Sequence, residues 1–571
     1  MTIPRILVVD DDVEMRRMMT QFLQKNGSIA LPAANEAEVR AHLEAENAHT
    51  EAFFASRSDL RETLLDEMRG RIKEDDSSVP QNDGPFAYST RYEVGGEHPR
   101  YCRRPRDGGL EDEVVLLDGD ALAQGHAYWN LAAVDHAPDH AHIAYAVDLK
   151  GSEIYTVKFR TADGSDLEDE IEGTSGNFTW APDGRHVFYT VLDDNHRPSK
   201  VMRHELGTSA DRDAVVFEEG DPGFFVGVSV TESERFIVID SHDHVTSEAR
   251  LIDARTPTRE PTVVRPREAG VEYDVGHHGD HLIIRTNKDG AEDYKVVRCP
   301  LTGDWAHDWE DLIPHESGRL IANVLLYARY MVRLERVDAL PRIVVRTMST
   351  GAEEALTFDE AVYTLGAHGS LEFDTDVLRF SYGSMATPSR VYDQDMRTGT
   401  RTLRKEQEVP SGHDPSAYVV ERIMARAADG EAVPVSILRR AGVEGPAPCL
   451  LYGYGAYGNS MPAGFSTARL SLVDRGFVFA IAHVRGGMER GYRWYRLGKG
   501  RHKGNTFTDF VAAADALIEG GYTSKGRIAA RGGSAGGMLM GWLVNNAPDT
   551  FGAVVAEVPF RARGERALGS T

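Results

Sequence analysis

The sequence is poor in the features that mark exported and membrane-spanning proteins. It has three cysteines, Cys102, Cys299 and Cys449, which have neither the short spacing of a zinc site nor the density of a disulfide scaffold. No apolar run approaches the ~18 residues of a membrane-spanning helix. The run near the N-terminus, ILVV, is ended at once by aspartates and is unlike a secretory signal. We therefore expect a cytoplasmic protein.

Positive charge is also scarce, with 64 Lys and Arg against 89 Asp and Glu and a net charge of −25. This balance argues against nucleic acid or an anionic membrane as partner, and it favours either cationic ligands or solubility alone.

Hydrophobic residues make up 41% of the chain and no tract is dominated by Pro, Ser or Gly, so the chain can fold. At ~100 to 200 residues per domain, its length predicts several domains.

The first residues read as a strand at 5–9, an acidic triplet, a helix at 13–25 and a second apolar run at 29–31. This βαβ opening resembles the start of a response-regulator receiver domain, in which carboxylates placed like Asp10 and Asp11 hold a magnesium ion. The phosphate-accepting aspartate of that family is missing from EAFFASRS at 51–58. We therefore do not carry over the phosphorylation chemistry, and Asp10 and Asp11 are metal candidates through this resemblance alone. Residues 36–74 are predicted to be charged amphipathic helix.

From about residue 82 to 410, short β-rich runs alternate with turns of Asp, Gly and Pro. A loose unit recurs with successive starts 44 to 55 residues apart, close to the roughly 40 to 50 residues of a four-stranded blade. The seven starts lie near Asp83, Pro138, Pro182, Glu232, Gly279, Leu326 and Phe373. The repeat predicts a seven-bladed β-propeller.

Three histidine clusters fall at predicted turns of this propeller: HAPDHAH at 136–142, HDH at 242–244 and HHGDH at 277–281. They lack cysteine and helical spacing, which favours surface loops over metal ligation. No metal and no cofactor are predicted.

After about residue 412 the pattern changes to alternating strands and helices. A hairpin at 419–438 leads to strands at 449–452 and 477–482, a helix at 506–519, a strand at 527–531, a helix to 546 and a strand at 552–558. This alternation predicts a parallel α/β sheet.

The stretch GGSAG at 532–536 satisfies G-x-S-x-G between a predicted strand and a predicted helix. Its glycines permit the strained turn that lifts the hydroxyl of Ser534 off the sheet, and the helix N-terminus favours negative charge developing beside it. The alternative is a glycine-rich packing turn. The context favours Ser534 as a nucleophile.

A serine nucleophile needs a base, usually a histidine that a carboxylate orients. No histidine follows Ser534, and the only aspartate after it is Asp549, while Glu557 lies in a predicted strand. Upstream, His483 and His502 suit strand-end and loop roles. The sequence therefore assigns no base to Ser534.

From about residue 36 to 560 the chain resembles the oligopeptidase B group of the prolyl oligopeptidase family of serine peptidases. The stretches that carry the resemblance are EAENAHTEAFF, RGRIKEDDSSVP, DDNHRPSKVMRHELGT, DPGFFVGV, DSHDHVTSE, FSYGSMATPSRVYDQDM, LLYGYGAYG, HVRGGMERG, NTFTDF and GGSAGGMLMG. The resemblance implies an α/β-hydrolase domain with a seven-bladed propeller over its active site, which restricts substrates to short peptides, and cleavage after Arg or Lys.

By the same resemblance Ser534 is the nucleophile, the Ala535 backbone N–H is one oxyanion donor and the Tyr454 hydroxyl is the other. The sequence also departs from the family. Met488 stands where a third loop glycine is expected, and the family's catalytic aspartate and histidine lie further downstream than the 37 residues that follow Ser534 here. We therefore expect a chain that is C-terminally truncated relative to the family, lacks the triad aspartate and histidine, and is inactive.

The predicted organisation is a receiver-like fragment at 1–40, a helical N-terminal segment of the peptidase at 41–80, a seven-bladed propeller at 81–412, a truncated α/β-hydrolase domain at 413–560 and an unrelated tail at 561–571. The predicted function is that of a serine endopeptidase acting on short basic peptides. One alternative is a non-catalytic propeller protein that binds peptides. Another is a signalling protein using the receiver-like start, which the missing phosphate-accepting aspartate disfavours.

Overall fold

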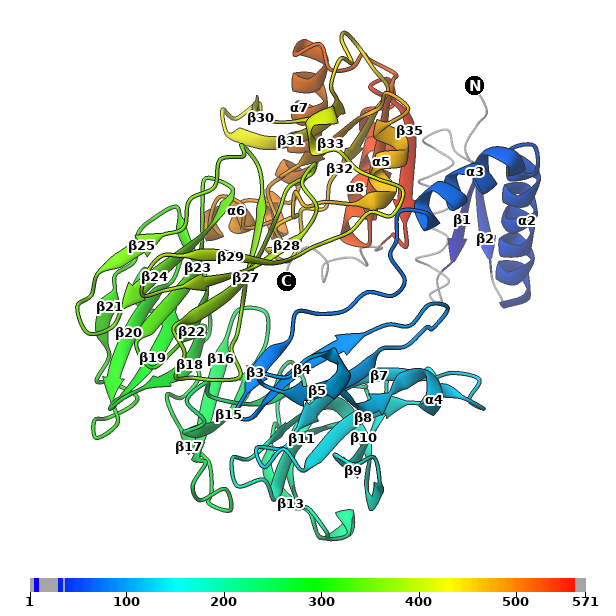
Figure 1. Ribbon diagram of the computed structural model, residues 1–571. Helices are drawn as coiled ribbons and strands as arrows, with labels where there is room; N and C mark the ends of the chain where they lie inside the picture. The colour runs from blue at the N-terminus through cyan, green and yellow to red at the C-terminus, as the bar shows by residue number, and fades with distance from the viewer. Residues whose placement is uncertain (1–4, 10–28, 34–35, 560–571) are drawn as a thin grey trace. The chain divides into compact units, whose positions relative to one another are not determined.

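A computed structural model describes residues 5–9, 29–33 and 36–559, which divide into two compact units, 1–71 and 72–571 (Figure 1). In the first unit β1 (Arg5–Val9) and β2 (Ile29–Ala33) pair in parallel. They are followed by helices α2 (Glu36–Ala55) and α3 (Ser58–Arg69), which confirm the helical stretch expected from residue 36. The helix expected at 13–25 and the candidates Asp10 and Asp11 lie outside the described residues.

The second unit begins with antiparallel sheets whose strands follow one another in chain order. Five of the sheets have four strands each. These are β3–β6 (Gln81–Asp83, Phe86–Arg91, Arg100–Pro105, Val114–Asp118), β14–β17 (Phe225–Val230, Phe236–His242, Ser247–Asp253, Thr262–Val263), β18–β21 (Tyr273–His278, His281–Thr286, Lys295–Pro300, Glu310–Ile313), β22–β25 (Arg319–Leu326, Tyr330–Val337, Leu340–Thr347, Glu353–Ala355) and β26–β29 (Thr364–His368, Val377–Gly383, Arg390–Asp395, Arg401–Glu406).

The remaining strands of this region form one seven-stranded sheet, which corrects the prediction of seven separate blades. Its strands are β7 (Asn130–His136), β8 (His142–Asp148), β9 (Tyr155–Thr161), β10 (Asp166–Trp180), β11 (His186–Leu192), β12 (Pro198–Glu205) and β13 (Ala214–Glu218). Strand β10 pairs with β9 through residues 166–174 and with β11 through residues 174–180, shifting register between Thr174 and Phe178. Strands expected in two sheets are therefore joined, and the propeller shows five four-stranded blades beside this larger sheet.

Apolar cores lie between successive propeller sheets. One buries Phe188 and Val201 of the seven-stranded sheet against Val226, Ile237 and Ile239 of the β14–β17 sheet. Burying both partners of such contacts removes apolar surface from water at roughly 25 cal/mol per Å². The sheets are therefore held face to face by hydrophobic packing.

The chain then forms a six-stranded sheet in the order β30-β31-β33-β32-β34-β35. The strands are β30 (Tyr418–Arg426), β31 (Ala432–Arg440), β32 (Cys449–Tyr452), β33 (Val478–Ala482), β34 (Ile528–Gly533) and β35 (Phe551–Glu557). The helices that follow β32, β33 and β34 are α5 (Thr467–Val473), α6 (Tyr492–Arg496), α7 (Gly504–Glu519) and α8 (Ala535–Asn546). Strands β33, β32, β34 and β35 are parallel and β30–β31 is an antiparallel hairpin, as predicted to within two residues.

The loop after β33 is bonded to the propeller sheets. The carboxylate of Asp293 accepts the N–H of Tyr492 and that of Gly318, each at 2.6 Å. The Ala339 N–H donates to the carbonyl oxygen of Glu489 at 2.9 Å. These bonds fix one stretch of the α/β sheet's loops against two neighbouring propeller sheets.

Cys102, Cys299 and Cys449 are buried and form no disulfide, in agreement with their spacing in the sequence. Among the helices of the described ranges, none has the length and apolar character needed to cross a membrane.

Candidate active site

The segment Gly532–Gly536 turns from β34 directly into α8. Ser534 occupies the turn with φ 53° and ψ −116°, a positive-φ conformation that costs a non-glycine residue of order 1 to 3 kcal/mol. Its N–H donates to the carbonyl oxygen of Glu557 in β35 at 2.9 Å, and its side chain is exposed. The strand–turn–helix geometry expected from the sequence is present, and it holds the hydroxyl at the carboxyl end of the strand.

Glycine is required at two positions of this turn because backbone atoms lie very close. A Cβ at Gly532 would stand 2.5 Å from the carbonyl oxygen of Gly536 and 3.0 Å from that of Gly453. A Cβ at Gly536 would stand 2.7 Å from the same Gly453 oxygen. Any side chain at either position would therefore push the turn away from residue 453.

Tyr454 lies beside the turn. It follows β32, which runs parallel to β34 with Tyr452 opposite Arg531, and the Gly453 N–H donates to the Arg531 carbonyl oxygen at 3.2 Å. A Cβ at Gly536 would lie 3.3 Å from the Tyr454 Cα. Neighbouring parallel strands end at the same edge of a sheet, which is where α/β proteins place their ligands.

Ala535 is the first residue of α8 and is 2% exposed. The N–H groups in the first turn of a helix have no partner within the helix, and the positive end of the helix dipole lies there. The fold thus brings together the three residues singled out from the sequence, Ser534, Ala535 and Tyr454, in an arrangement suited to acyl transfer.

Lys503 anchors the loop that follows Tyr454, a role that the sequence does not indicate. Its Nζ donates to the carbonyl oxygen of Gly455 at 2.5 Å and lies 5.9 Å from the ring centroid of Phe507. Burial lowers the pKa of Lys503 to about 8. A lysine just before a helix carries no local signal of such a contact, because the residue that it bonds lies in a distant loop.

The loop after β33 is held by a buried ion pair that no sequence motif indicates. Arg485 donates from Nε to Asp509 Oδ2 at 2.8 Å and from a terminal nitrogen to Oδ1 at 2.5 Å, and its backbone N–H reaches Oδ2 at 3.0 Å. Asp429 accepts a further bond from the guanidinium at 2.5 Å. Arg485 and Asp509 are 1% and 0% exposed, so the pair locks this loop onto α7.

The same loop packs tightly on the one that follows Tyr454. At Gly486, with φ 107°, a Cβ would stand 1.9 Å from the carbonyl oxygen of Gly455. Met488, the departure noted in the sequence, lies against Gly458 and packs on a propeller core that includes Leu320. The methionine side chain therefore fills space between the loop and the propeller.

His483, considered as a substitute base, is engaged elsewhere. Its Nε2 lies 2.7 Å from the Ser436 hydroxyl, and its Nδ1 lies 3.6 Å from Oε1 of Glu489. All three side chains are buried, and His483 and Ser436 line a cavity of about 70 Å³ that Arg336 also lines. These contacts commit His483 to a buried network within the fold and not to Ser534.

The side chains of the other candidates do not engage the Ser534 hydroxyl either. His502 and Asp549 are exposed, and Glu557 pairs with Arg531 at 2.9 Å. Within residues 5–9, 29–33 and 36–559, the Ser534 hydroxyl has no hydrogen-bond partner. The described residues thus bring Ser534, Ala535 and Tyr454 together at one edge of the sheet, and they place no base beside the Ser534 hydroxyl.

Comparison with known families agrees with this architecture. Residues 31–407 match the family described as "Prolyl oligopeptidase, N-terminal beta-propeller domain", and residues 463–562 match the "Prolyl oligopeptidase family". Neither is a receiver domain, and the first match already begins inside the predicted receiver-like fragment. These matches do not support the receiver resemblance of the first residues.

Individual proteins are similar across both parts. Dipeptidyl aminopeptidase BI of Pseudoxanthomonas mexicana is 40% identical over 542 residues, which are 92% of this chain and 75% of that protein. Protease 2 of Moraxella lacunata is 33% identical over 532 residues, with 92% and 76% covered. The closed structure of oligopeptidase B from Trypanosoma brucei with covalently bound antipain is 37% identical with a TM-score of 0.87, covering 92% of this chain and 76% of that one. The chain belongs to the prolyl oligopeptidase family of serine peptidases.

Proposed function

We propose that Ser534 is the nucleophile of a serine oligopeptidase and that the Ala535 N–H and the Tyr454 hydroxyl are its oxyanion donors. The observation that carries this proposal is the strained turn at Ser534 packed against Tyr454 at the carboxyl ends of β34 and β32. Donors fixed in this way stabilise charge that appears only in the transition state. The propeller restricts substrates to short peptides.

In the proposed reaction the Ser534 Oγ attacks the carbonyl carbon of the scissile bond while a base takes the hydroxyl proton. The oxyanion forms between the two donors, and the amine leaves with the proton that the base returns. Water then attacks the acyl-enzyme and releases the acid. The described residues carry the nucleophile and the donors, and the base is not among those that contact Ser534.

We propose basic peptides, cleaved after Arg or Lys, as substrates. The similarity to oligopeptidase B and the name of the similar dipeptidyl aminopeptidase BI support a peptidase for short substrates. The net charge of −25 favours cationic ligands.

We also propose that this 571-residue chain turns over peptides poorly, because a serine hydroxyl without a base is a weak nucleophile. The engagement of His483 with Ser436 supports this proposal, since it removes one of the candidate bases raised by the sequence. Peptide binding without turnover is the second candidate function. The contact of His483 with Ser436 favours it as well.

Two measurements on the full chain separate these proposals. The first is hydrolysis of a fluorogenic peptide amide with arginine before the scissile bond. The second is labelling by a fluorophosphonate, with the labelled residue located by mass spectrometry. We expect negligible hydrolysis and slow labelling at Ser534 that Ser534→Ala abolishes. Rapid hydrolysis abolished by Ser534→Ala would refute the proposed inactivity, and labelling elsewhere would refute the nucleophile.

Anisotropy of a fluorescent peptide tests the binding candidate and the preference for basic residues. A peptide with one arginine should bind more tightly than the same peptide with glutamine in that place. Equal affinities would contradict the proposed preference. The binding-only function would be excluded if the peptide did not bind and the fluorogenic peptide amide were hydrolysed rapidly.

A further inference from the structure

Two histidines and one aspartate converge where the β3–β4 hairpin meets the turn between β7 and β8. Asp83 ends β3, His136 ends β7, and His140 lies in the turn that leads to β8. One ligand atom from each of the three side chains lies within 4.8 Å of the others, and within residues 5–9, 29–33 and 36–559 this is the sole such group of His, Cys, Asp and Glu.

The histidines come from HAPDHAH, a cluster that the sequence assigned to a surface loop. The structure corrects that assignment for His136. The side chain of His136 is only 13% exposed, and its Nε2 lies 2.7 Å from Oδ2 of Asp83. The missing third ligand is therefore supplied by a carboxylate from another sheet, which no local pattern around residues 136–142 could reveal.

Surrounding contacts hold both imidazoles in place. The ring of His136 stacks on that of Tyr88 with centroids 3.7 Å apart and planes 9° from parallel. The Tyr88 hydroxyl lies 2.9 Å from Nδ1 of His140. A histidine that ligates a metal through one nitrogen is usually hydrogen-bonded through the other, which fixes its orientation. The Tyr88 contact leaves the Nε2 of His140 for such a ligand bond.

The close approach of residue 84 to that nitrogen requires glycine. Gly84 has φ 51°, and a Cβ there would stand 2.8 Å from Nε2 of His140. The turn that carries His140 is closed by its N–H bonding the Ala137 carbonyl oxygen at 2.8 Å, and its own carbonyl oxygen accepts a bond from Arg103. The ligands of the cluster are thus held in place, and a side chain at residue 84 would crowd one of them.

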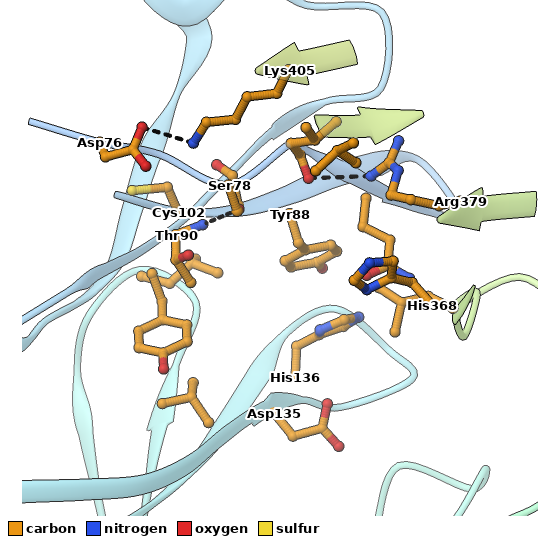
Figure 2. Close-up of a pocket in the computed structure, with 18 of the residues that line it drawn as sticks. Asp76, Ser78, Tyr88, Thr90, Cys102, Asp135, His136, His368, Arg379 and Lys405 are labelled. Carbon is orange, nitrogen blue, oxygen red and sulfur yellow. Dashed lines mark hydrogen bonds and ion pairs between the residues drawn. The ribbon is translucent and has the colours of Figure 1, made fainter. Parts of the chain in front are cut away.

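The cluster adjoins a cavity of about 670 Å³. Tyr88 and His136 are among the residues lining it, together with His368 of β26 and Cys102 of β5. Figure 2 shows Tyr88, His136 and His368 gathered along one wall of this cavity. Water and small ligands therefore have room to occupy coordination positions that the protein leaves open.

We propose that Asp83, His136 and His140 bind a divalent transition-metal ion of the zinc type. Two imidazoles and one carboxylate suit such an ion, whereas calcium and magnesium prefer oxygen ligands alone. Ligand atoms about 2.0 to 2.2 Å from zinc stand about 3.4 Å apart in tetrahedral geometry, so small side-chain shifts close the site. Three protein ligands leave a fourth position for water. The ion links the β3–β4 hairpin to the β7–β8 turn.

Metal binding to the full chain, freed of metal with a chelator, tests the proposal directly. Titration with Co²⁺, followed by visible absorption, and with Zn²⁺, followed by calorimetry, should show one site per chain. His140→Ala should abolish the Co²⁺ absorption and the calorimetric binding. Absence of binding by the wild-type chain, or unchanged binding by His140→Ala, would overturn the proposal.

Two further variants keep the test interpretable. His242→Ala is the matched control, because His242 forms a similar pair with Asp240 at 2.8 Å outside the proposed cluster. It should bind the metal normally. Tyr88→Phe keeps the ring and removes the hydroxyl, so it should fold and bind about 10-fold to 100-fold more weakly. Unchanged affinity in Tyr88→Phe, or a loss in His242→Ala equal to that in His140→Ala, would contradict the assigned ligands.

Discussion

The ammonium of Lys503 donates a hydrogen bond to the carbonyl oxygen of Gly455 at 2.5 Å. This bond ties the residue before α7 to the loop that carries Tyr454, and the loop in turn packs on the turn at Ser534. A half-buried amine near the proposed oxyanion donors makes the stability of this region depend on pH.

Burial lowers the folded-state pKa of Lys503 to about 8, below the ordinary 10.5. Between these two values Lys503 is protonated more often in the unfolded chain than in the folded chain, so its own contribution to the free energy of unfolding rises with pH across this window. Lys503→Met should remove this rise, whose slope is at most about 1.4 kcal/mol per pH unit. Urea unfolding at about pH 7.5 and about pH 9.5 measures it.

Lys525→Met is the control for that experiment, because Lys525 is an exposed lysine in the same region of the chain. It should leave the pH dependence of the wild-type chain unchanged. Identical pH slopes in the wild type and in Lys503→Met would show that the amine is not buried as described.

Gly532→Ala should destabilise the protein, because the added Cβ would stand 2.5 Å from a backbone oxygen. Overpacking of this kind typically costs about 1 to 3 kcal/mol. Gly541→Ala is the matched substitution, since Gly541 lies within α8 with nothing within 4 Å of its Cβ position. It should stabilise by about 0.5 to 1 kcal/mol. Denaturant midpoints measure both, and equal shifts would contradict the close approach at residue 532.

Arg485→Met should be strongly destabilising, because it leaves Asp509 as an unpaired buried carboxylate. Breaking one partner of a buried pair costs about 3 to 5 kcal/mol. Arg255→Met removes a comparable pair with Asp253 in which Arg255 is 72% exposed, and there the cost should stay below about 1 kcal/mol. Similar losses in both variants, measured by urea unfolding, would rule out the locking role of the Arg485 pair.

The three cysteines should resist thiol reagents in the folded protein. Burial raises the pKa of the Cys102 thiol to about 12, that of Cys299 to about 11 and that of Cys449 to about 12, and the thiolate is the reactive form. Colour development with Ellman's reagent should be slow at pH 8 and should reach three thiols per chain in denaturant. Fast reaction of one thiol in the native protein would contradict its burial.

The sequence by itself determined the local elements of this protein. The hairpin β30–β31, the strands β32 to β35 and the turn at Ser534 follow from hydrophobic periodicity, turn residues and glycine, which act over a few neighbouring positions. The β-rich repeat likewise predicted a propeller. These features could be read because their causes lie within the segments that show them.

Tertiary structure alone decided which distant residues meet. The repeat could not show that β10 would extend far enough to join two expected sheets into one. No pattern near His483 predicts its bond to Ser436, and none near His136 predicts Asp83. Such contacts depend on how separate strands are placed side by side, and that placement is set by the packing of the whole core and not by local preference.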